Sequence, residues 1–327
     1  MKQNHIRALI NIRPSFNGSF HQPSAFLMLG IPGLEALHPW ISIPFCALYL
    51  TALLGNCMIL FIIRRTQSLH EPMYYFLCML AVTDLGLALC TLPTTLGLFW
   101  FNLRSIGFDA CLAQMYFIHI LSFIESSVLL AMAFDRFIAI SRPLRHPSIL
   151  TKATVTKIGL AIVAVLFFLP LPLLLLPLPF CGSRALSHSF CLHQDVMNLA
   201  CANTTPSVVY GLAAILLVMG LDALLICLSY LLILKAVLRL AAWRERLKVF
   251  STCIAHICVV LAFYVPLIGL SVVHRFGRDL APLVHVTMGN IYILVPAVLN
   301  PIIYGVRTKQ IQRRILSLIR VGDRTSQ

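Results

Sequence analysis

Charged residues are scarce in this 327-residue chain, in which Asp, Glu, Lys and Arg together make up 11% of the sequence. A typical soluble domain carries about a quarter charged residues. Hydrophobic residues make up 59% of the chain, and the mean hydropathy is +0.90. The shortage of charge therefore excludes an ordinary soluble domain and indicates a membrane protein.

Acidic residues are the scarcer kind of charge, with 11 Asp and Glu against 25 Lys and Arg. The basic residues lie in short gaps between apolar runs rather than in one patch, so we expect no nucleic-acid partner. The sequence also lacks an internal repeat and any stretch long enough for a separate soluble domain. Its first 25 residues lack the apolar centre of a cleavable signal peptide.

Long apolar runs are what the chain has in abundance. A membrane-spanning helix needs about 20 mainly apolar residues, whereas the strand of a membrane barrel needs about ten. Backbone amides cannot stay unpaired in lipid, so runs of this length form helices. The sequence predicts an all-α membrane protein, a seven-helix bundle with spans at 39–63, 72–98, 110–134, 153–178, 207–234, 249–273 and 283–306.

The distribution of Lys and Arg predicts the orientation. With the N-terminus outside, 18 of the 25 basic residues fall in the inner loops and tail, as the positive-inside rule requires. We therefore expect an extracellular tail at 1–38, a membrane domain at 39–306, and a cytoplasmic amphipathic helix and tail at 307–327. The outer tail contains Asn17-Gly18-Ser19, an acceptor pattern for N-glycosylation.

Four of the 11 cysteines lie at or beyond the outer ends of the expected spans, and one of them, Cys111, opens the third span. They are Cys111, Cys181, Cys191 and Cys201, all on the outer side. Four cysteines in an oxidising compartment allow three pairings, and the residues alone do not choose among them. The other seven lie within spans, where cysteine usually acts as a small buried hydrophobe.

Three carboxylic side chains fall within the expected spans, which is costly in lipid. Asp84, Glu125 and Asp222 would stand about 15–20 Å above the inner face, at 1.5 Å per residue, and no Lys or Arg lies at that depth. Such groups form either an internal cation or proton site, or hydrogen bonds between helices. We favour the cation or proton site for Asp84 with Glu125, and the hydrogen bond for Asp222.

A serine and an arginine share one face near the outer end of the sixth span. Ser271 and Arg275 are four residues apart, which places them on neighbouring turns of a helix. Arg275 is suited to hold an anionic ligand, because guanidinium binds carboxylate through two hydrogen bonds. The alternative is an arginine that extends from a helix end into water.

Several motifs occur together along the chain. They are "LHEPMYYFL" (69–77), "MAFDRFIAI" (132–140), "SY" (229–230), "KVFSTCIAH" (248–256) and "PIIYGVRTKQI" (301–311). With seven spans, this set resembles the olfactory receptors of the rhodopsin-like G-protein-coupled class. Three further stretches resemble the fish-like class I group, close to family 51: "GIPGLE" (30–35), "SFCLHQD" (189–195) and "FYVPLIGLSVVHRFG" (263–277).

The resemblance implies pairings and a ligand. It implies disulfides Cys111–Cys191 and Cys181–Cys201. It also implies a small odorant, a carboxylic acid in many class I receptors, held by Arg275. The other positions that match the family's ligand pocket are Ser271, His119 and Gln194.

The resemblance further implies a plasma-membrane receptor that activates a heterotrimeric G protein of the stimulatory or olfactory type and raises cAMP. Membrane lipids are the remaining partner. No organic cofactor is expected, and sodium is the ion that the family's site at Asp84 and Glu125 would hold.

The Asp135–Arg136 pair, at the inner end of the third span, has two interpretations. It terminates the span as a charged boundary, or it is part of a latch with Tyr230, His256 and Tyr304 near the inner ends of the later spans. In the latch, Asp135 holds Arg136 at rest and releases it on activation. The family's usual Asp-Arg-Tyr is Asp-Arg-Phe here, so the ring remains and its hydroxyl is lost.

A transporter or channel and an intramembrane enzyme are the two alternative functional classes. A transporter or channel would also use carboxylates near the membrane centre, but the chain lacks paired broken helices in two matching halves. An intramembrane enzyme would need a nucleophile beside a base or a metal-spaced cluster such as H-E-x-x-H, and the 11 histidines are scattered. We therefore expect a receptor and no enzyme.

Overall fold

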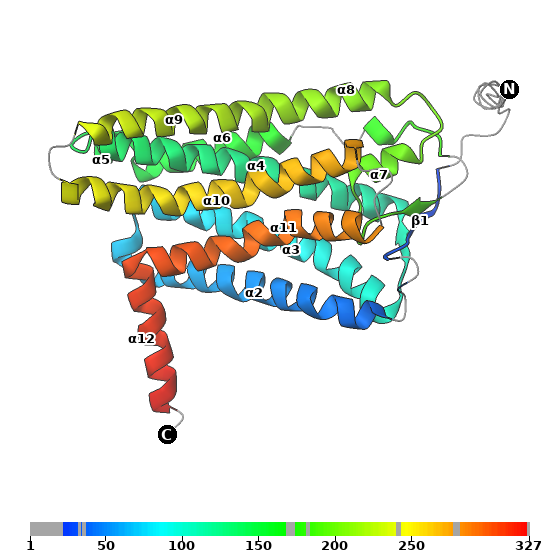
Figure 1. Ribbon diagram of the computed structural model, residues 1–327, viewed down its shortest axis with the longest axis horizontal. Coiled ribbons are helices and arrows are strands. Elements are labelled where there is room, and N and C mark those ends of the chain that lie inside the picture. The colour runs from blue at the N-terminus through cyan, green and yellow to red at the C-terminus, as the bar shows by residue number, and fades with distance from the viewer. Residues whose placement is uncertain are drawn as a thin grey trace, which may run out of the picture.

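The protein is described from a computed structural model, which covers residues 22–31, 34, 37–167, 174–180, 184–239, 243–276 and 282–325. Long helices run side by side along the longest axis of the molecule (Figure 1). They are α2 (His38–Arg65), α3 (Pro72–Phe101), α4 (Phe108–Ser141), α6 (Lys152–Phe167), α8 (Thr205–Ala214) with α9 (Leu221–Leu238), α10 (Trp243–Phe276) and α11 (Pro282–Arg307).

Six helical stretches within the described ranges are long and apolar enough to cross a membrane. They are His38–Arg65, Pro72–Phe101, Phe108–Ser141, Thr205–Leu238, Val249–Val273 and Leu283–Arg307. The remaining predicted span, the fourth at 153–178, begins with α6, whose 16 described residues are followed by residues 168–173, outside the described part. The predicted helical bundle is therefore confirmed, with the expected spans at the expected places.

Several helices extend beyond the spans that hydropathy predicts. The third span was expected to end at 134, but α4 continues to Ser141, so Asp135 and Arg136 lie inside a helix rather than at its end. Hydropathy marks the part of a helix that lies in lipid, and backbone hydrogen bonding continues into the aqueous interface. The interpretation of the pair as a mere boundary therefore loses its main support.

Local sequence explains where helices begin and end. Proline occupies the first turn of α3 at Pro72, where its missing N–H is not needed and its fixed φ suits the helix. The same helix ends at Asn102, which adopts a left-handed conformation with φ 52°, the usual role of Asn or Gly after a helix. Pro143 follows the end of α4 and prevents its continuation.

The helix from Thr205 to Leu238 contains a wider, π-helical turn, η4 (Ile215–Gly220), between α8 and α9. Such turns often occur at functional sites, because the extra residue displaces the side chains on either side of it. Here the turn faces the cavity described below.

Three short strands form a sheet at one end of the bundle. They are β1 (Ala25–Met28), β2 (Ser105–Gly107) and β3 (Ala185–Leu186), in the order β2-β1-β3. β1 is antiparallel to β2, with Phe26 opposite Ile106, and parallel to β3. The sequence analysis did not predict this sheet, because strands of two to four residues show no clear alternation.

The remaining short elements mark the two ends of the molecule (Figure 1). α7 (His193–Asn198) lies with β1 at one end, and α5 (His146–Ile149) lies at the other, where α12 (Lys309–Thr325) leaves the bundle roughly at right angles. One further short turn, η2 (Gln67–Leu69), joins α2 to α3. The direction of α12 agrees with an amphipathic helix that lies along a membrane surface.

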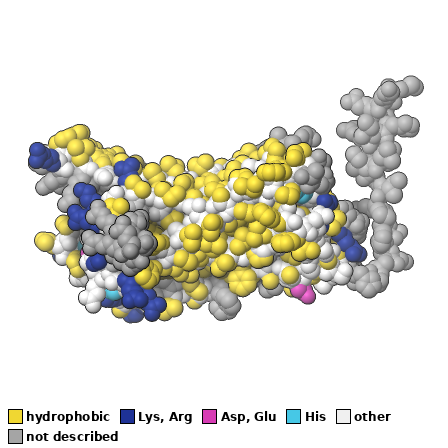
Figure 2. Space-filling model, turned by 90° about the horizontal axis from the view of Figure 1, so that it is seen from below, with side chains coloured by type: hydrophobic (Ala, Val, Ile, Leu, Met, Phe, Trp, Pro, Cys, Tyr) yellow, Lys and Arg dark blue, Asp and Glu magenta, His cyan; other side chains and the backbone are white. Residues whose placement is uncertain are grey.

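Charge separates along the same axis. Figure 2 shows hydrophobic side chains across the middle of the visible face, with Lys and Arg gathered at its ends. More of the basic groups lie at the end that carries α5 and α12. The core between the helices is mainly aromatic and aliphatic, with Phe76, Phe123 and Phe263 fully buried in one cluster.

Candidate functional site

A disulfide joins the loop after α6 to the start of α4. It pairs Cys111 with Cys191, both fully buried, and confirms that prediction. Cys201 is disulfide-bonded as well, and its predicted partner, Cys181, lies outside the described residues. The first disulfide holds the loop that follows Cys191 over the helix bundle.

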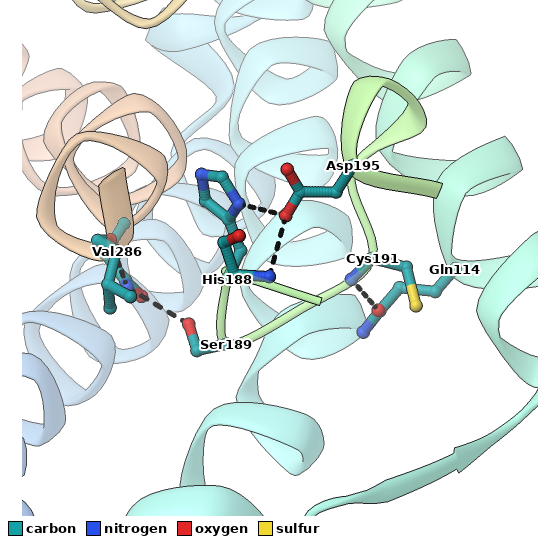
Figure 3. A network of polar contacts seen from close by, with 8 residues as sticks. Gln114, His188, Ser189, Cys191, Asp195 and Val286 are labelled. Carbon is teal, nitrogen blue, oxygen red and sulfur yellow. Dashed lines mark hydrogen bonds and ion pairs between the residues drawn. The ribbon is translucent and has the colours of Figure 1, made fainter. Parts of the chain in front are cut away.

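A buried glutamine reinforces this attachment (Figure 3). The Gln114 side chain accepts a hydrogen bond from the backbone N–H of Cys191 at 2.8 Å. Its Nε2 donates to the Cys90 carbonyl at 2.9 Å and to Thr94 Oγ1 at 3.0 Å. One side chain on α4 thus holds both the loop and α3, and uses its amide donors and acceptor to do so.

The same loop also contacts α11. Asn290 of α11 donates to Ser189 Oγ at 3.1 Å, and Figure 3 shows Ser189 facing the helix that carries Val286. Within the loop, Asp195 accepts a hydrogen bond from the backbone of Ser187 at 3.1 Å and pairs with His188. The loop is therefore a structured cover, held by contacts to α3, α4 and α11.

A small cavity lies beneath this cover, with a volume of about 60 Å³. It is lined by Ile118, His119, Ser122, Phe123, Leu192, Gln194, Ile215, Met219, Leu267, Leu270, Ser271 and Tyr292. Three of the four predicted ligand residues, His119, Gln194 and Ser271, therefore lie around one cavity. The fourth, Arg275, belongs to α10, but its side chain lies outside the described part of the structure.

The polar groups of the cavity have defined hydrogen-bonding roles. His119 Nδ1 lies 3.0 Å from the Met115 carbonyl, which can only accept, so Nδ1 carries the hydrogen and neutral His119 has Nε2 as its acceptor. Tyr292 donates to Ser122 Oγ at 2.7 Å. A ligand would thus meet an acceptor at His119 and hydroxyl or amide groups at Ser271 and Gln194.

A second histidine, which the sequence analysis did not single out, lies against His119. The two ring centroids of His119 and His193 are 5.7 Å apart, and His193 is buried in α7. Burial lowers the pKa of His193 to about 4, because an apolar surrounding disfavours the charged imidazolium. His193 is therefore neutral at physiological pH and adds no positive charge beside the cavity.

The two predicted ion-site carboxyls are both buried deeper in the bundle. Asp84 Oδ2 accepts a hydrogen bond from Asn300 at 2.9 Å, and Glu125 lies within electrostatic range of Asp84. Among the described residues, Asp84 Oδ1, Asn300 Oδ1 and both Glu125 oxygens have no hydrogen-bond partner. Hard cations prefer oxygen ligands, so these atoms suit a bound cation or protons.

Asp222 makes the interhelical hydrogen bonds that we expected. Its Oδ2 accepts from Ser126 Oγ at 2.8 Å and from Ser127 Oγ at 3.2 Å, which connects α9 to α4. Ser126 Oγ also lies 2.8 Å from the Tyr264 hydroxyl on α10.

The inner end of the bundle holds the predicted latch residues. Asp135 is buried, and its Oδ2 lies 3.3 Å from Arg136 Nη2. The Tyr230 hydroxyl lies 2.6 Å from His256 Nδ1. Arg136 interacts electrostatically with Tyr230, His256 and Tyr304. All the predicted latch residues are therefore in contact with, or close to, Arg136. These residues are thus neighbours, and their role in switching stays a prediction.

His146 is a contact of the latch that the sequence analysis missed. Its Nε2 lies 2.9 Å from Asp135 Oδ1, so the buried carboxylate has one partner on each oxygen. His146 begins the short helix α5, 11 residues after Asp135. Only the turn between α4 and α5 brings it back, and no pattern in the sequence marks that turn as a return to Asp135.

Comparison with known proteins gives a consistent result. A family model described as olfactory receptor matches residues 45–321. Olfactory receptor 51E2 of Rattus norvegicus is 58% identical over 301 residues, covering 91% of this chain and 94% of that receptor. Olfactory receptor 51G2 of Homo sapiens is 56% identical, covering 91% of this chain and 96% of its own length. Squid rhodopsin has the same fold, with a TM-score of 0.68, 17% identity, and coverage of 86% of this chain and 85% of rhodopsin.

Proposed function

The chain belongs to the olfactory receptor family, and from that premise we propose that it detects a small carboxylic acid and raises cAMP through a stimulatory or olfactory G protein. The family consists of odorant receptors that act on G proteins and are not enzymes. Membership also places the chain in the plasma membrane as a multi-pass protein. The ligand class and the type of G protein are the proposed parts.

The cavity around His119, Gln194 and Ser271 is the observation that carries the proposal for the ligand. A volume of about 60 Å³ is far below the roughly 300–1,000 Å³ of sites for drug-sized molecules. The ligand is therefore small, and it contacts polar groups at one side and Ile118, Leu267 and Phe123 at the other.

Arg275 supplies the charge in this proposal. It follows Ser271 by one helical turn on α10, and a guanidinium bonds both oxygens of a carboxylate. His193 is neutral at pH 7 and the His119 acceptor Nε2 carries no charge, so Arg275 gives the preference for an anion. Ser271 then donates to the same carboxylate and orients it.

A panel of short aliphatic acids, with their alcohols and methyl esters, tests this proposal in cells that report cAMP. We expect an acid to activate, and Arg275→Ala to raise its half-maximal concentration at least about tenfold, because a charged hydrogen bond contributes about 1.5–3 kcal/mol. Arg278→Ala, also on the outer side, is the matched control. Equal responses to acids and esters, or an unchanged dose response in Arg275→Ala with normal surface expression, would reject the anion site.

The inner end supports a G-protein partner. Leu144 is 96% exposed between Arg142 and Arg145, and the three line a cavity of about 400 Å³ with Pro143. An exposed leucine between two arginines is suited to dock on an apolar hollow with an acidic rim. Binding an agonist at the outer end favours the active arrangement only through higher affinity for that arrangement.

The arrangement across the membrane completes the proposal. The N-terminal segment 1–38, with a glycan on Asn17, faces outside, and the membrane domain 39–306 leads to the cytoplasmic helix and tail 307–327. Asn17 lies outside the described residues. The basic end of the molecule in Figure 2 would face the anionic inner leaflet. Epitope tags at the two termini, stained before and after permeabilisation, test the orientation.

Asp84 and Glu125 would hold a sodium ion or protons beneath the ligand cavity. Their unpartnered oxygens and that of Asn300 would supply ligands, and a sodium ion there would balance the charge of one of the two carboxylates. Dependence of agonist potency on sodium, lost in Asp84→Asn, would support the ion; identical potency in sodium and in an organic cation would leave protons as the occupants.

A further inference from the structure

A second cavity lies on the lipid-facing side of the inner half of the bundle. Its volume is about 550 Å³, within the range of sites for organic ligands. It is bounded by Ser127, Leu130, Ala131, Phe134 and Phe137 of α4, Ile158 and Ile162 of α6, and Asp222, Leu225, Leu228, Ser229 and Leu232 of α9. We call this cavity the α4–α6–α9 groove.

The groove follows α9 for several turns. On α9 its lining residues run from Asp222 to Leu232, which is about 15 Å along a helix at 1.5 Å per residue. Phe134, Leu225 and Leu228 are exposed on the outside of the bundle, so the groove is open to the membrane. A molecule dissolved in the lipid can therefore enter it without crossing the outer cavity.

A carboxyl group closes the end of the groove nearest the membrane centre. Both hydrogen bonds that Asp222 accepts, from Ser126 and Ser127, fall on Oδ2. Among the described residues, no Lys, Arg or His forms an ion pair with Asp222. The second oxygen, Oδ1, thus remains for another partner at the head of a groove whose other lining residues are apolar except for Ser127 and Ser229.

We propose that the α4–α6–α9 groove binds a lipid-soluble amine, with its nitrogen at Asp222 Oδ1 and its hydrocarbon body along Leu225, Leu228 and Leu232. A carboxylate in a medium of low dielectric requires a proton or a cation beside it. An amine crosses lipid as the free base and shares one proton with the carboxyl group in the groove. This site is separate from the outer cavity and independent of the proposed acid.

Other lipid-soluble molecules provide a poorer partner for the Asp222 carboxyl group. The acyl chain of a phospholipid would place a methyl group against Asp222 and leave Oδ1 without a partner. A neutral alcohol of the same length makes one hydrogen bond to the carboxyl oxygen but brings no charge. The preference for an amine over its alcohol therefore distinguishes this site from general partition into lipid.

The test uses the full-length receptor in phosphatidylcholine nanodiscs. The probe is dodecylamine that carries a diazirine near its chain end, and labelled peptides are located by mass spectrometry. We expect labelling on α4 and α9, displaced by unlabelled dodecylamine at concentrations at least about tenfold lower than dodecanol, since a charged hydrogen bond exceeds a neutral one. Equal displacement by the two compounds, or labels spread over all lipid-facing helices, would overturn the proposal.

Three variants sharpen the result. Asp222→Asn keeps the shape of the side chain and an acceptor for Ser126 and Ser127. In this variant dodecylamine should displace the probe only at the concentrations that dodecanol requires. Leu228→Trp fills the groove and should abolish labelling by the dodecylamine probe without touching the carboxyl group. Leu224→Trp, on the same helix and exposed outside the groove, is the control and should label normally. An unchanged preference for the amine over the alcohol in Asp222→Asn, or wild-type labelling in Leu228→Trp, would contradict the site.

Discussion

The two ends of this receptor treat their buried polar groups differently. At the outer end, Gln114 uses its amide in three hydrogen bonds that join the loop, α3 and α4. At the inner end, Asp135 is shared between Arg136 and His146. The Tyr304 hydroxyl, also buried there, has no hydrogen-bond partner within the described ranges. At the outer end Gln114 has fixed hydrogen-bond partners, whereas at the inner end Asp135 and Arg136 have other partners within reach.

This difference agrees with the two tasks of a receptor. A small cavity keeps its selectivity only if its walls stay in place, which the disulfide and the Gln114 bonds provide. A switch needs two arrangements of similar free energy, because a ligand shifts an equilibrium only by its difference in affinity for the two states. An arginine beside an unpartnered tyrosine hydroxyl supplies an alternative partner for the second arrangement.

Removing Arg136 should have the largest effect. In the predicted latch Arg136 is the group that leaves Asp135 on activation, so we expect Arg136→Ala to lose the agonist-evoked cAMP response while surface expression and ligand binding persist. The control is Arg64→Ala, an exposed arginine in the last turn of α2. A normal cAMP response in Arg136→Ala would reject the latch and return the pair to a purely structural role.

Removing the hydrogen bonds of Gln114 should lower the stability of the receptor rather than impair its switching. Gln114→Ala removes three hydrogen bonds and leaves the buried N–H of Cys191 unsatisfied, so unfolding should become easier by about 2–4 kcal/mol. Thermal melting of the purified receptor measures this. Gln22→Ala, which removes one exposed bond to the Leu176 carbonyl, should change the melting temperature little. Equal effects of the two variants would show that the cover is not held through Gln114.

Changing His146 should have the smallest effect. His146→Ala frees Asp135 Oδ1, so Arg136 can bond both oxygens and the resting arrangement becomes more stable, by about 0.5–1 kcal/mol. We expect the half-maximal agonist concentration to rise about two- to fivefold. His146→Tyr keeps a donor for that oxygen and should restore the potency. A rise in basal cAMP in His146→Ala would mean that His146 itself holds the receptor at rest.

Much of the architecture could be predicted from sequence, because membrane insertion depends on local properties. Twenty apolar residues in a row specify a helix in lipid wherever they occur, so the spans fell where hydropathy placed them. The end of α4 was misplaced at 134 for the same reason, since hydropathy ends where lipid ends and the helix continues. Motifs such as "KVFSTCIAH" (248–256) indicated the family before any contact was known.

The candidate site was predictable only in part. The family resemblance indicated His119, Gln194 and Ser271, and they do line one cavity. His193 and Gln114 were missed, although both lie beside that cavity or support its cover. A lone histidine in a loop and a glutamine in an apolar helix carry no signal of their own until their neighbours are known.

The sequence by itself determined the helical bundle and the unusual depth of Asp84, Glu125 and Asp222, since both follow from composition along short stretches, and its motifs indicated the family. Tertiary structure alone decided which groups meet. Asn300 bonds Asp84 across 216 residues of chain, and Gln114 bonds Cys191 across 77. Such contacts depend on how whole helices pack, and packing is a property of facing surfaces rather than of any one segment. The same packing leaves Asp222 at the head of a lipid-facing groove, which its place in the sequence does not indicate.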